Sequence, residues 1–248
     1  MYNPFSLTGK TILVTGASSG IGKAIAIECS KMGASVIITG RNEERLNQTF
    51  ELLEGSNHNK IVCDLFSEES INELSEHLSS LNGIVHAAGI VKNLPFQFVS
   101  SKEIKKIFDI NFFAPILLSH LLVKGKKITK GASIVFISSI SGPITAVTGN
   151  SMYSASKGAV TAMAKSMAVD LAPKKVRVNC ILPGMIETPL IHAGEITQEQ
   201  LDDHMKLYPL KRFGKPEEIA YAAIYFLSDV SAWTTGANLI IDGGFTLL

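Results

Sequence analysis

Short apolar segments alternate with longer amphipathic segments along the whole chain. The apolar segments are rich in Val, Ile and Leu, as strands are, and the amphipathic segments have helical spacing. Strands are predicted at residues 11–15, 35–39, 60–63, 84–86, 133–138, 176–181 and 238–241. Helices are predicted at residues 21–32, 42–54, 102–123 and 152–171, and two more begin after Ser67 and at Pro216. Because the strands are continuously apolar, both of their faces are expected to be buried. This indicates an α/β fold, a doubly wound parallel sheet of about seven strands with helices on both faces.

The chain has 248 residues, the length of one α/β domain, and no linker, repeat or low-complexity segment divides it. We therefore expect a single nucleotide-binding domain over residues 1–248. The least regular stretch, residues 186–208, follows the predicted strand at 176–181. Doubly wound sheets bind ligands at the carboxyl ends of their strands, so this stretch is predicted to be a flap over a substrate site. A plain surface excursion is the alternative.

Composition excludes several classes of function. Hydrophobic residues make up 46% of the chain and charged residues 18%, which is typical of a folded protein with a large core. The net charge of +1 gives no bulk attraction to nucleic acid or to an anionic membrane. No apolar run of membrane-spanning length or signal peptide is evident, so we expect a cytoplasmic protein with no membrane partner. Cys29, Cys63 and Cys180 are expected to be reduced and buried, and no cluster has metal-ligand spacing.

A glycine-rich turn, residues 15–22 (TGASSGIG), connects the first predicted strand to the first predicted helix. A dinucleotide-binding fingerprint requires this context of strand, turn and helix. Gly16 permits the tight turn, Gly20 allows the backbone to approach a pyrophosphate, and Gly22 allows the helix to pack on the strand. The sequence therefore predicts a Rossmann-like nucleotide site. The cofactor contacts expected from the turn are Gly16, Ser18, Ser19, Gly20, Ile21 and Gly22.

The residues after the second predicted strand indicate which dinucleotide binds. A carboxylate at this position binds the ribose 2′-hydroxyl of NAD and repels the 2′-phosphate of NADP. This chain has Thr39-Gly40-Arg41-Asn42 instead, so the guanidinium of Arg41 is available to a phosphate. We therefore predict that NADP(H) is favoured over NAD(H). The alternative is that Arg41 is a surface residue at a helix N-terminus.

Tyr153 and Lys157 are four residues apart within a predicted helix, so their side chains are expected on one face. A phenol with its ordinary pKa of about 10 is a poor acid or base at neutral pH. A fixed positive charge nearby favours the phenolate and lowers that pKa. The pair is therefore predicted to carry proton transfer. Two exposed residues on an amphipathic helix would have the same spacing.

These motifs occur in an order that resembles the short-chain dehydrogenase/reductase family along nearly the whole chain. The residues that carry the resemblance are the turn at 15–22, His86-Ala87-Ala88-Gly89, Asn111, Ser139, Tyr153, Lys157, the segment 183–188 (PGMIET) and Asp242-Gly243-Gly244. Within the family, the chain is similar to bacterial 3-oxoacyl-(acyl-carrier-protein) reductases.

The resemblance implies a role for each matching residue. Tyr153 exchanges a proton with the substrate oxygen, Ser139 hydrogen-bonds that oxygen, and Lys157 binds the nicotinamide ribose and lowers the phenol's pKa. Asn111 supports a water-linked proton relay to the lysine, and Pro115, which has no N–H, leaves the Asn111 carbonyl free to hold that water. The further cofactor contacts that the resemblance implies are Asp64, Leu65, Ala88, Gly89, Tyr153, Lys157, Pro183, Gly184, Ile186 and Thr188.

Three of these assignments have alternatives. Ser139 is three residues before Gly142, as in the family pattern, and Ser141 is the other candidate; Ser138 is expected to point away from Ser139. Asp64 is also a candidate N-cap of the next helix. His86 stands where the family usually has Asn, and we expect a hydrogen-bonded structural role for it.

The substrate pocket is expected to be apolar. Its predicted lining consists of Phe96, Phe98, Met185, Leu190, Leu207 and Tyr208, with His192 and His204 as further candidates. A basic cluster could dock an acidic acyl carrier protein or complement a helix C-terminus; it consists of Lys124, Lys126, Lys127 and Lys130, with Lys174 and Lys175 nearby.

The expected function is NADPH-dependent reduction of a ketone to a secondary alcohol, with a 3-oxoacyl thioester as the favoured substrate. Dehydrogenation of a sugar, a steroid or another secondary alcohol is the first alternative, and a non-catalytic nucleotide sensor is the second. Family analogy also implies a homotetramer built through the helices that contain Asn111 and Tyr153.

Overall fold

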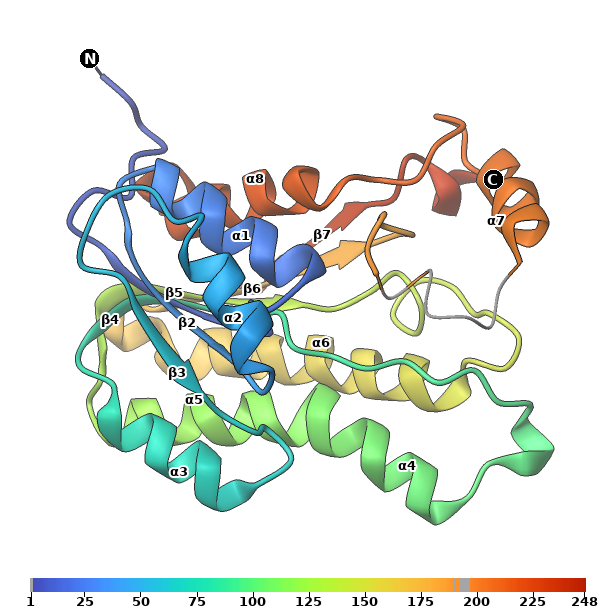
Figure 1. Cartoon of the computed structure of the whole chain (residues 1–248), viewed down its shortest axis with the longest axis horizontal. Coiled ribbons are helices and arrows are strands. Elements are labelled where there is room, and N and C mark those ends of the chain that lie inside the picture. Colours follow the sequence, from blue (N-terminus) through green and yellow to red (C-terminus); the bar gives the residue numbers. More distant parts are fainter. Residues whose placement is uncertain (1, 190, 192–196) are drawn as a thin grey trace.

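The computed structural model describes residues 2–189, 191 and 197–248. Its centre is a seven-stranded sheet in the order β3-β2-β1-β4-β5-β6-β7, and every neighbouring pair is parallel (Figure 1). The strands are Thr11–Thr15 (β1), Ser35–Gly40 (β2), Asn59–Val62 (β3), Leu81–His86 (β4), Ile128–Ile137 (β5), Arg177–Pro183 (β6) and Asn238–Ile241 (β7). The predicted α/β fold class is confirmed. The strand order reverses between β1 and β4, and a doubly wound sheet has its ligand crevice at that point.

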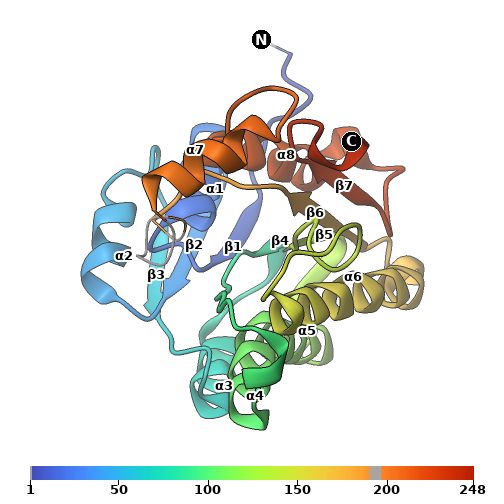
Figure 2. The same ribbon diagram turned by 90° about the vertical axis from the view of Figure 1, so that its right-hand side faces the viewer.

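Helices cover both faces of the sheet (Figure 2). One face carries α1 (Gly20–Lys31) and α8 (Pro216–Leu227), with α2 (Glu43–Phe50) beside them. The opposite face carries α3 (Glu68–His77), α4 (Ser101–Phe108), α5 (Ala114–Lys124) and α6 (Ser151–Leu171), while α7 is Gln198–Lys206. The sheet separates two hydrophobic cores, one with side chains of α1 and α8 and the other with side chains of α5 and α6. In β1, Ile12 and Val14 belong to the first of these cores and Leu13 belongs to the second. This alternation explains why the strands are apolar without interruption.

The predicted helix at 102–123 is wrong in detail, because the structure has two α-helices joined by a π-helical turn, Asp109–Phe113. The Ala114 N–H donates to the Asp109 carbonyl, five residues earlier. Pro115 cannot donate to the Asn111 carbonyl, so the chain widens here instead of continuing the α-helical ladder. Short 3-10 helices occur at Phe96–Phe98, Ala172–Lys174, Asp229–Ser231 and Phe245–Leu247.

The predicted flap at 186–208 is not irregular throughout, because α7 forms its second half. Thr197 and Gln200 form a reciprocal capping box at the start of this helix. Such a box satisfies backbone N–H groups that a helix start leaves free. The flap residues Leu190 and 192–196 lie outside the described part of the chain.

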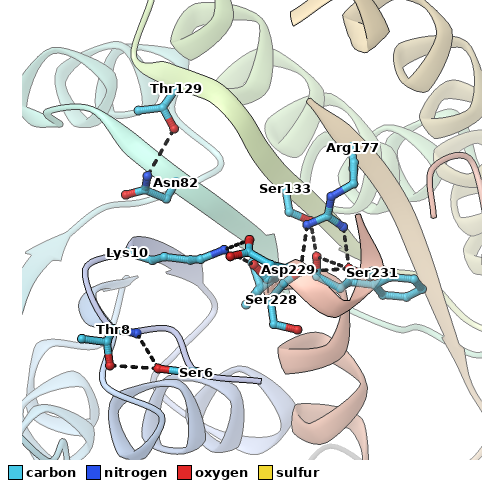
Figure 3. A network of polar contacts seen from close by, with 12 residues as sticks. Ser6, Thr8, Lys10, Asn82, Thr129, Ser133, Arg177, Ser228, Asp229 and Ser231 are labelled. Atoms are coloured by element: carbon cyan, nitrogen blue, oxygen red, sulfur yellow. Dashed lines mark hydrogen bonds and ion pairs between the residues drawn. The ribbon is translucent and has the colours of Figure 1, made fainter. Parts of the chain in front are cut away.

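A polar network ties the amino ends of β1 and β6 to the segment after α8 (Figure 3). The guanidinium of Arg177 is buried and donates to the Ser231 hydroxyl at 2.6 Å and to the Ser228 carbonyl at 3.2 Å. On the surface nearby, Lys10 pairs with Asp229, whose side chain is 86% exposed. The buried part of the network is therefore expected to contribute most of its stability.

Arg177→Ala is expected to lower the free energy of unfolding by about 2–4 kcal/mol, because it removes charged hydrogen bonds and leaves a cavity. Asp229→Ala is the matched control, and losing an exposed ion pair is expected to cost less than about 1 kcal/mol. Urea denaturation of both variants measures the difference. Equal effects would show that the buried guanidinium is not the stabilising group.

By length and composition, one helical stretch among the described residues, Ser101–Lys124, could cross a membrane. In the fold it comprises α4, the π-helical turn and α5, and 44% of its most apolar window is buried. There α5 packs against α3, and α4 packs against α6. A core helix meets the same criteria, so this stretch is weak evidence for a membrane span.

Candidate active site

A cleft of about 640 Å³ lies beyond the carboxyl ends of β4, β5 and β6. Its walls are the loops after these strands, the start of α6, α7 and the C-terminal Phe245. Of the predicted site residues, those that line it are Ile21, Gly89, Ser139, Tyr153, Lys157, Pro183, Gly184, Ile186 and Thr188. The cleft therefore brings predicted catalytic and cofactor residues together from five separate segments.

Ser139 and Tyr153 bring two hydroxyls together in the cleft. Burial raises the pKa of the Tyr153 phenol, and a hydrogen bond with the Ser139 side chain opposes that rise. The Ser141 N–H donates to the Ser139 hydroxyl at 3.1 Å. Ser138 instead donates to the Lys157 carbonyl on α6. The structure thus places Ser139 against the phenol and turns Ser138 toward the helix backbone.

A glycine permits the contact between the serine loop and α6. Gly142 has φ +103°, and a Cβ there would collide with the backbone carbonyl of Ser154. A side chain at this position would push the loop away from the residue that follows Tyr153. Gly142 therefore helps to set the spacing between Ser139 and Tyr153.

Lys157 is oriented differently from the sequence-based prediction. Its ammonium donates to the Ile137 carbonyl at 2.8 Å and lies 5.6 Å from the centre of the Tyr153 ring. Burial lowers the pKa of this lysine from 10.5 to about 8, and nearby Cys180 opposes that shift. The phenol's pKa is raised overall, opposite to the expected direction, because burial of the phenol dominates.

Asn111 holds the loop after β4 in place. Its carboxamide accepts from the Ile90 N–H and donates to the Ile90 carbonyl, both at 2.9 Å, and donates to Ser156 on α6 at 3.1 Å. A Cβ at Gly89 would come 3.4 Å from both Asn111 Oδ1 and Lys157 Nζ. The side chain of Asn111 thus organises the loop beside Lys157, and the water-holding role of its carbonyl stays a prediction.

The glycine-rich turn has the geometry needed for close approach by a pyrophosphate. Gly16 has φ +67°, and a Cβ there would come 2.6 Å from Cα of Ala88; at Gly22 it would collide with the Gly16 carbonyl. Gly20 has φ +54°, and a Cβ there would come 3.1 Å from the Thr188 side chain. Ser19 is the N-cap of α1, yet its side chain makes no capping bond, and no acidic residue is in the first turn. The N–H groups of this helix start therefore suit a pyrophosphate.

The residues at the ends of β2 and β3 lie outside the cleft lining. A Cβ at Gly40 would come 3.3 Å from the Ser18 hydroxyl, so Ser18 lies beside the segment that leads to exposed Arg41. Asp64 accepts from the Phe66 N–H, whereas Ser67 caps α3, so the proposal that Asp64 is the N-cap is wrong. Leu65 and Ala88 line a small hollow next to His86.

His86 has the predicted structural role. Its Nε2 is 2.8 Å from the Ser119 hydroxyl, and its ring stacks on Phe136 with centroids 4.9 Å apart. Burial lowers its pKa to about 3, so the ring is neutral at neutral pH. All three cysteines are free and buried, as predicted. Within the described residues, no group of three or more His, Cys, Asp or Glu side chains could hold a metal ion.

The predicted apolar lining is partly wrong. Met185, Tyr208 and His204 line the cleft, whereas the side chains of Phe96, Phe98 and Leu207 are 80%, 62% and 54% exposed. Leu190 and His192 lie outside the described residues. Gln200, within the predicted flap at 186–208, also lines the cleft. The cleft lining that the sequence did not indicate includes Val147, Asn150 and Phe245. The return of the C-terminus to the cleft had no signal in the sequence.

The basic cluster is not beside the cleft. The ends of α5 and α6, where these lysines are, lie at the amino edge of the sheet, and α7 lies toward the carboxyl edge (Figure 1). The cleft is beyond the carboxyl ends of the strands. Lys127 donates to the carbonyls of Ser75 and Glu76 at the end of α3, so this lysine does complement a helix C-terminus. Docking of a carrier protein by the cluster stays a prediction.

Comparison with known proteins gives the class of this protein. A family model described as "Enoyl-(Acyl carrier protein) reductase" matches residues 16–246. The 3-oxoacyl-[acyl-carrier-protein] reductase FabG of Rickettsia prowazekii is 34% identical, over 98% of this chain and 99% of that protein. Glucose 1-dehydrogenase 2 of Bacillus subtilis is also 34% identical, over 97% and 96%. The structure of a short chain dehydrogenase family protein from Francisella tularensis has a TM-score of 0.84 and 32% identity, and covers 96% of this chain and 99% of its own.

With this fold and these matches, the chain belongs to the short-chain dehydrogenase/reductase family. It is an NAD(P)-dependent oxidoreductase that acts on CH–OH and C=O groups.

Proposed function

We propose that this enzyme uses NADPH to reduce a ketone to a secondary alcohol. The observation that carries the proposal is the pairing of the Ser139 and Tyr153 hydroxyls inside the cleft, with the Lys157 ammonium on the same helix. The raised pKa of Tyr153 keeps the phenol protonated at neutral pH. A protonated phenol is the form that a reductase needs, because the step ends with a proton on the substrate oxygen.

The bound nicotinamide supplies the hydride, and the protein controls the oxygen. Ser139 and Tyr153 donate hydrogen bonds to the carbonyl oxygen, and these bonds strengthen as negative charge develops there. Tyr153 then transfers its proton to the oxygen. The charge of Lys157 would stabilise the resulting phenolate, and its ammonium would hold the nicotinamide ribose, as the family resemblance implies. Asn111 would connect this lysine to solvent through a bound water.

We assign the cofactor contacts to the residues proposed from the sequence. The start of α1 would hold the pyrophosphate, Asp64 and Leu65 the adenine, and the segment 183–188 the nicotinamide end. Arg41 is exposed and follows Gly40, which lies beside Ser18; with no carboxylate at the end of β2, this edge suits a 2′-phosphate. These features support NADP(H) over NAD(H).

Arg41→Ala is expected to raise the KM for NADPH about tenfold or more, because a charged contact to the 2′-phosphate is lost. The KM for NADH is expected to change little. Arg45→Ala is the matched control, an exposed arginine on the same helix start. Steady-state kinetics with both cofactors measures the effect, and an unchanged KM for NADPH would remove the argument for NADP.

We favour a 3-oxoacyl thioester as substrate, because curated relatives over the full length are 3-oxoacyl-[acyl-carrier-protein] reductases. An acyl carrier protein as partner rests on those relatives alone, since the lysine cluster is remote from the cleft. A sugar or another secondary alcohol is the second candidate, because a glucose dehydrogenase is equally similar. A screen that follows NADPH absorbance separates them. Turnover of acetoacetyl thioester but not of sugars selects the first, and no turnover of any compound would favour a sensor.

The remaining proposals concern the whole protein. A homotetramer through α5 and α6 is supported by two apolar side chains exposed on these elements, Phe113 at 54% and Val169 at 73%. A single domain over residues 1–248 is consistent with the one sheet that runs through the described chain. A cytoplasmic location follows from the balanced charge and the reduced cysteines.

A further inference from the structure

Two buried polar atoms in the cleft have no hydrogen-bond partner among the described residues. They are Oδ1 of Asn150 and Nδ1 of His204. Asn150 precedes Tyr153 at the start of α6, and His204 is on α7, so they come from separate walls of one cleft. Buried polar groups in proteins are nearly always hydrogen-bonded, and exceptions require an explanation.

Asn150 occupies an N-cap position without acting as a cap. It is the N-cap residue of α6, yet its side chain makes no capping bond, although Asn is among the best capping residues. The N-cap side chains that do cap their helices are Asn42, Ser67, Ser100 and Thr197. Asn150 instead lines the cleft, and the residue is only 8% exposed. A side chain that does not cap its helix and stays buried without a partner is available to a ligand.

His204 is fixed by aromatic packing rather than by polar contacts. Its ring stacks on Phe245 with centroids 5.8 Å apart and also lies near Tyr208 and Phe213. Burial lowers its pKa, so the imidazole is neutral at neutral pH and carries one donor and one acceptor nitrogen. Its neighbour Gln200 uses its side-chain oxygen in the capping box, so it is less free to accept from a ligand.

We propose that Asn150 and His204 are substrate-binding residues that hydrogen-bond a hydroxyl or an amide N–H on the substrate, beyond the carbon that Tyr153 serves. A substrate hydroxyl or amide N–H would donate to the Asn150 carboxamide oxygen, which has no donor. A hydroxyl could also donate to or accept from Nδ1 of His204, whichever tautomer the imidazole adopts. The enzyme therefore prefers ketones that carry such a group over plain aliphatic ketones. The inference rests on the proposed ketone reduction and specifies its substrate class.

Two pairs of substrates test the inference and distinguish the two sources of the donor. The first pair is a β-hydroxyketone and the same ketone with a methyl group in place of the hydroxyl. The second pair is the acetoacetyl thioester of N-acetylcysteamine, which has an amide, and the acetoacetyl S-butyl thioester, which does not. In the wild-type enzyme, kcat/KM is expected to be about tenfold or more higher for the hydrogen-bonding member of at least one pair, because the other member leaves buried polar groups unpaired.

Variants assign the preference to the two side chains. For the pair that the wild-type enzyme discriminates, the ratio of the two kcat/KM values is expected to fall about tenfold in Asn150→Leu and in His204→Phe. The fall is expected in kcat/KM of the hydrogen-bonding member. Asn150→Asp retains an acceptor and is expected to keep most of the ratio. Val147→Ala is the matched control, because it changes the cleft lining without removing a polar group. Thermal unfolding of each variant reports whether the fold is intact.

The outcomes are distinct. Wild-type turnover without a preference in either pair overturns this inference and leaves ketone reduction standing, and this measurement requires no variant. A preference that survives both Asn150→Leu and His204→Phe also overturns it. If none of the four ketones is reduced, both the proposed function and this inference are overturned.

Discussion

Tyr153→Phe is expected to lower kcat for ketone reduction by about three orders of magnitude, since general acid catalysis by a positioned side chain contributes about 10²–10⁴-fold. Phenylalanine fills the same space, and the phenol is half-buried in the cleft. The raised pKa of this phenol means that the wild-type enzyme carries the proton at neutral pH, and the variant has no proton to give. Steady-state kinetics at neutral pH, with NADPH affinity measured by fluorescence titration, separates loss of chemistry from loss of binding.

Ser139→Ala is the control for this assignment. It removes one donor to the substrate oxygen and is expected to cost about 10²-fold in kcat, as in other sites that stabilise an oxyanion. NADPH affinity is expected to stay within about twofold for Ser139→Ala, because Ser139 is assigned to the substrate oxygen alone. Tyr153 is also an expected cofactor contact, so the titration shows how much of the loss in Tyr153→Phe comes from weaker cofactor binding. A Tyr153→Phe enzyme with full turnover would refute the proton donor. A Ser139→Ala enzyme that loses more than Tyr153→Phe would reverse the two roles.

The sheet was predictable because its strands are buried on both faces. In a chain where short apolar runs alternate with amphipathic helices, a continuous apolar run such as residues 11–15 predicts a strand buried on both faces. The structure has β1 with these bounds. Shorter or more polar strands were placed less well. β5 begins at Ile128, earlier than predicted, because Lys130 and Gly131 interrupt the apolar pattern there.

Local chemistry predicted the start of several elements, and tertiary contacts decided the rest. The Ser67 cap follows from its side chain alone and is confirmed. The break between α4 and α5 was not predicted as a π-helical turn, although Pro115 predicted the missing hydrogen bond. How the helix responds to that loss depends on how Asn111 is held against Ile90 and Ser156. Those contacts are distant in sequence, so no local pattern reports them.

The order of motifs was sufficient to propose which residues form the site, but not how they interact. The spacing of Tyr153 and Lys157 correctly places both in one cleft. It could not show that the ammonium binds the Ile137 carbonyl, because that carbonyl belongs to β5. The pKa of a buried group depends on such contacts and on depth, so the expected direction for the phenol was wrong. The same limit applies to Asn150, because only the tertiary structure brings the start of α6 and α7 to the same cleft.

Lys157→Met is expected to lower kcat/KM for ketone reduction by about 10²-fold or more while making the fold more stable. The lost charge leaves the phenolate of Tyr153 without its stabilising cation and removes the donor for the nicotinamide ribose. In the folded protein the lysine's pKa falls from 10.5 to about 8, so its charged form is destabilised by about 3 kcal/mol. Methionine has no such cost but leaves the Ile137 carbonyl without this donor, a loss of about 1–2 kcal/mol. The expected net gain in the free energy of unfolding at pH 7 is about 1–2 kcal/mol.

The pH dependence gives this prediction a definite sign. Since the pKa of Lys157 is lower in the folded state than in the unfolded state, its destabilising effect is fully present below about pH 8 and disappears as the pH rises to about 10.5. The stability advantage of Lys157→Met is therefore expected to be largest at pH 7 and to shrink above pH 8, measured by urea denaturation across that range. Wild-type kcat/KM for NADPH is expected to fall above about pH 8 as the ammonium loses its proton, and Lys157→Arg, which stays charged, should move that fall to higher pH. If Lys157→Met is less stable than wild type at pH 7, or if its stability advantage grows with pH, burial of the ammonium does not destabilise the fold as predicted.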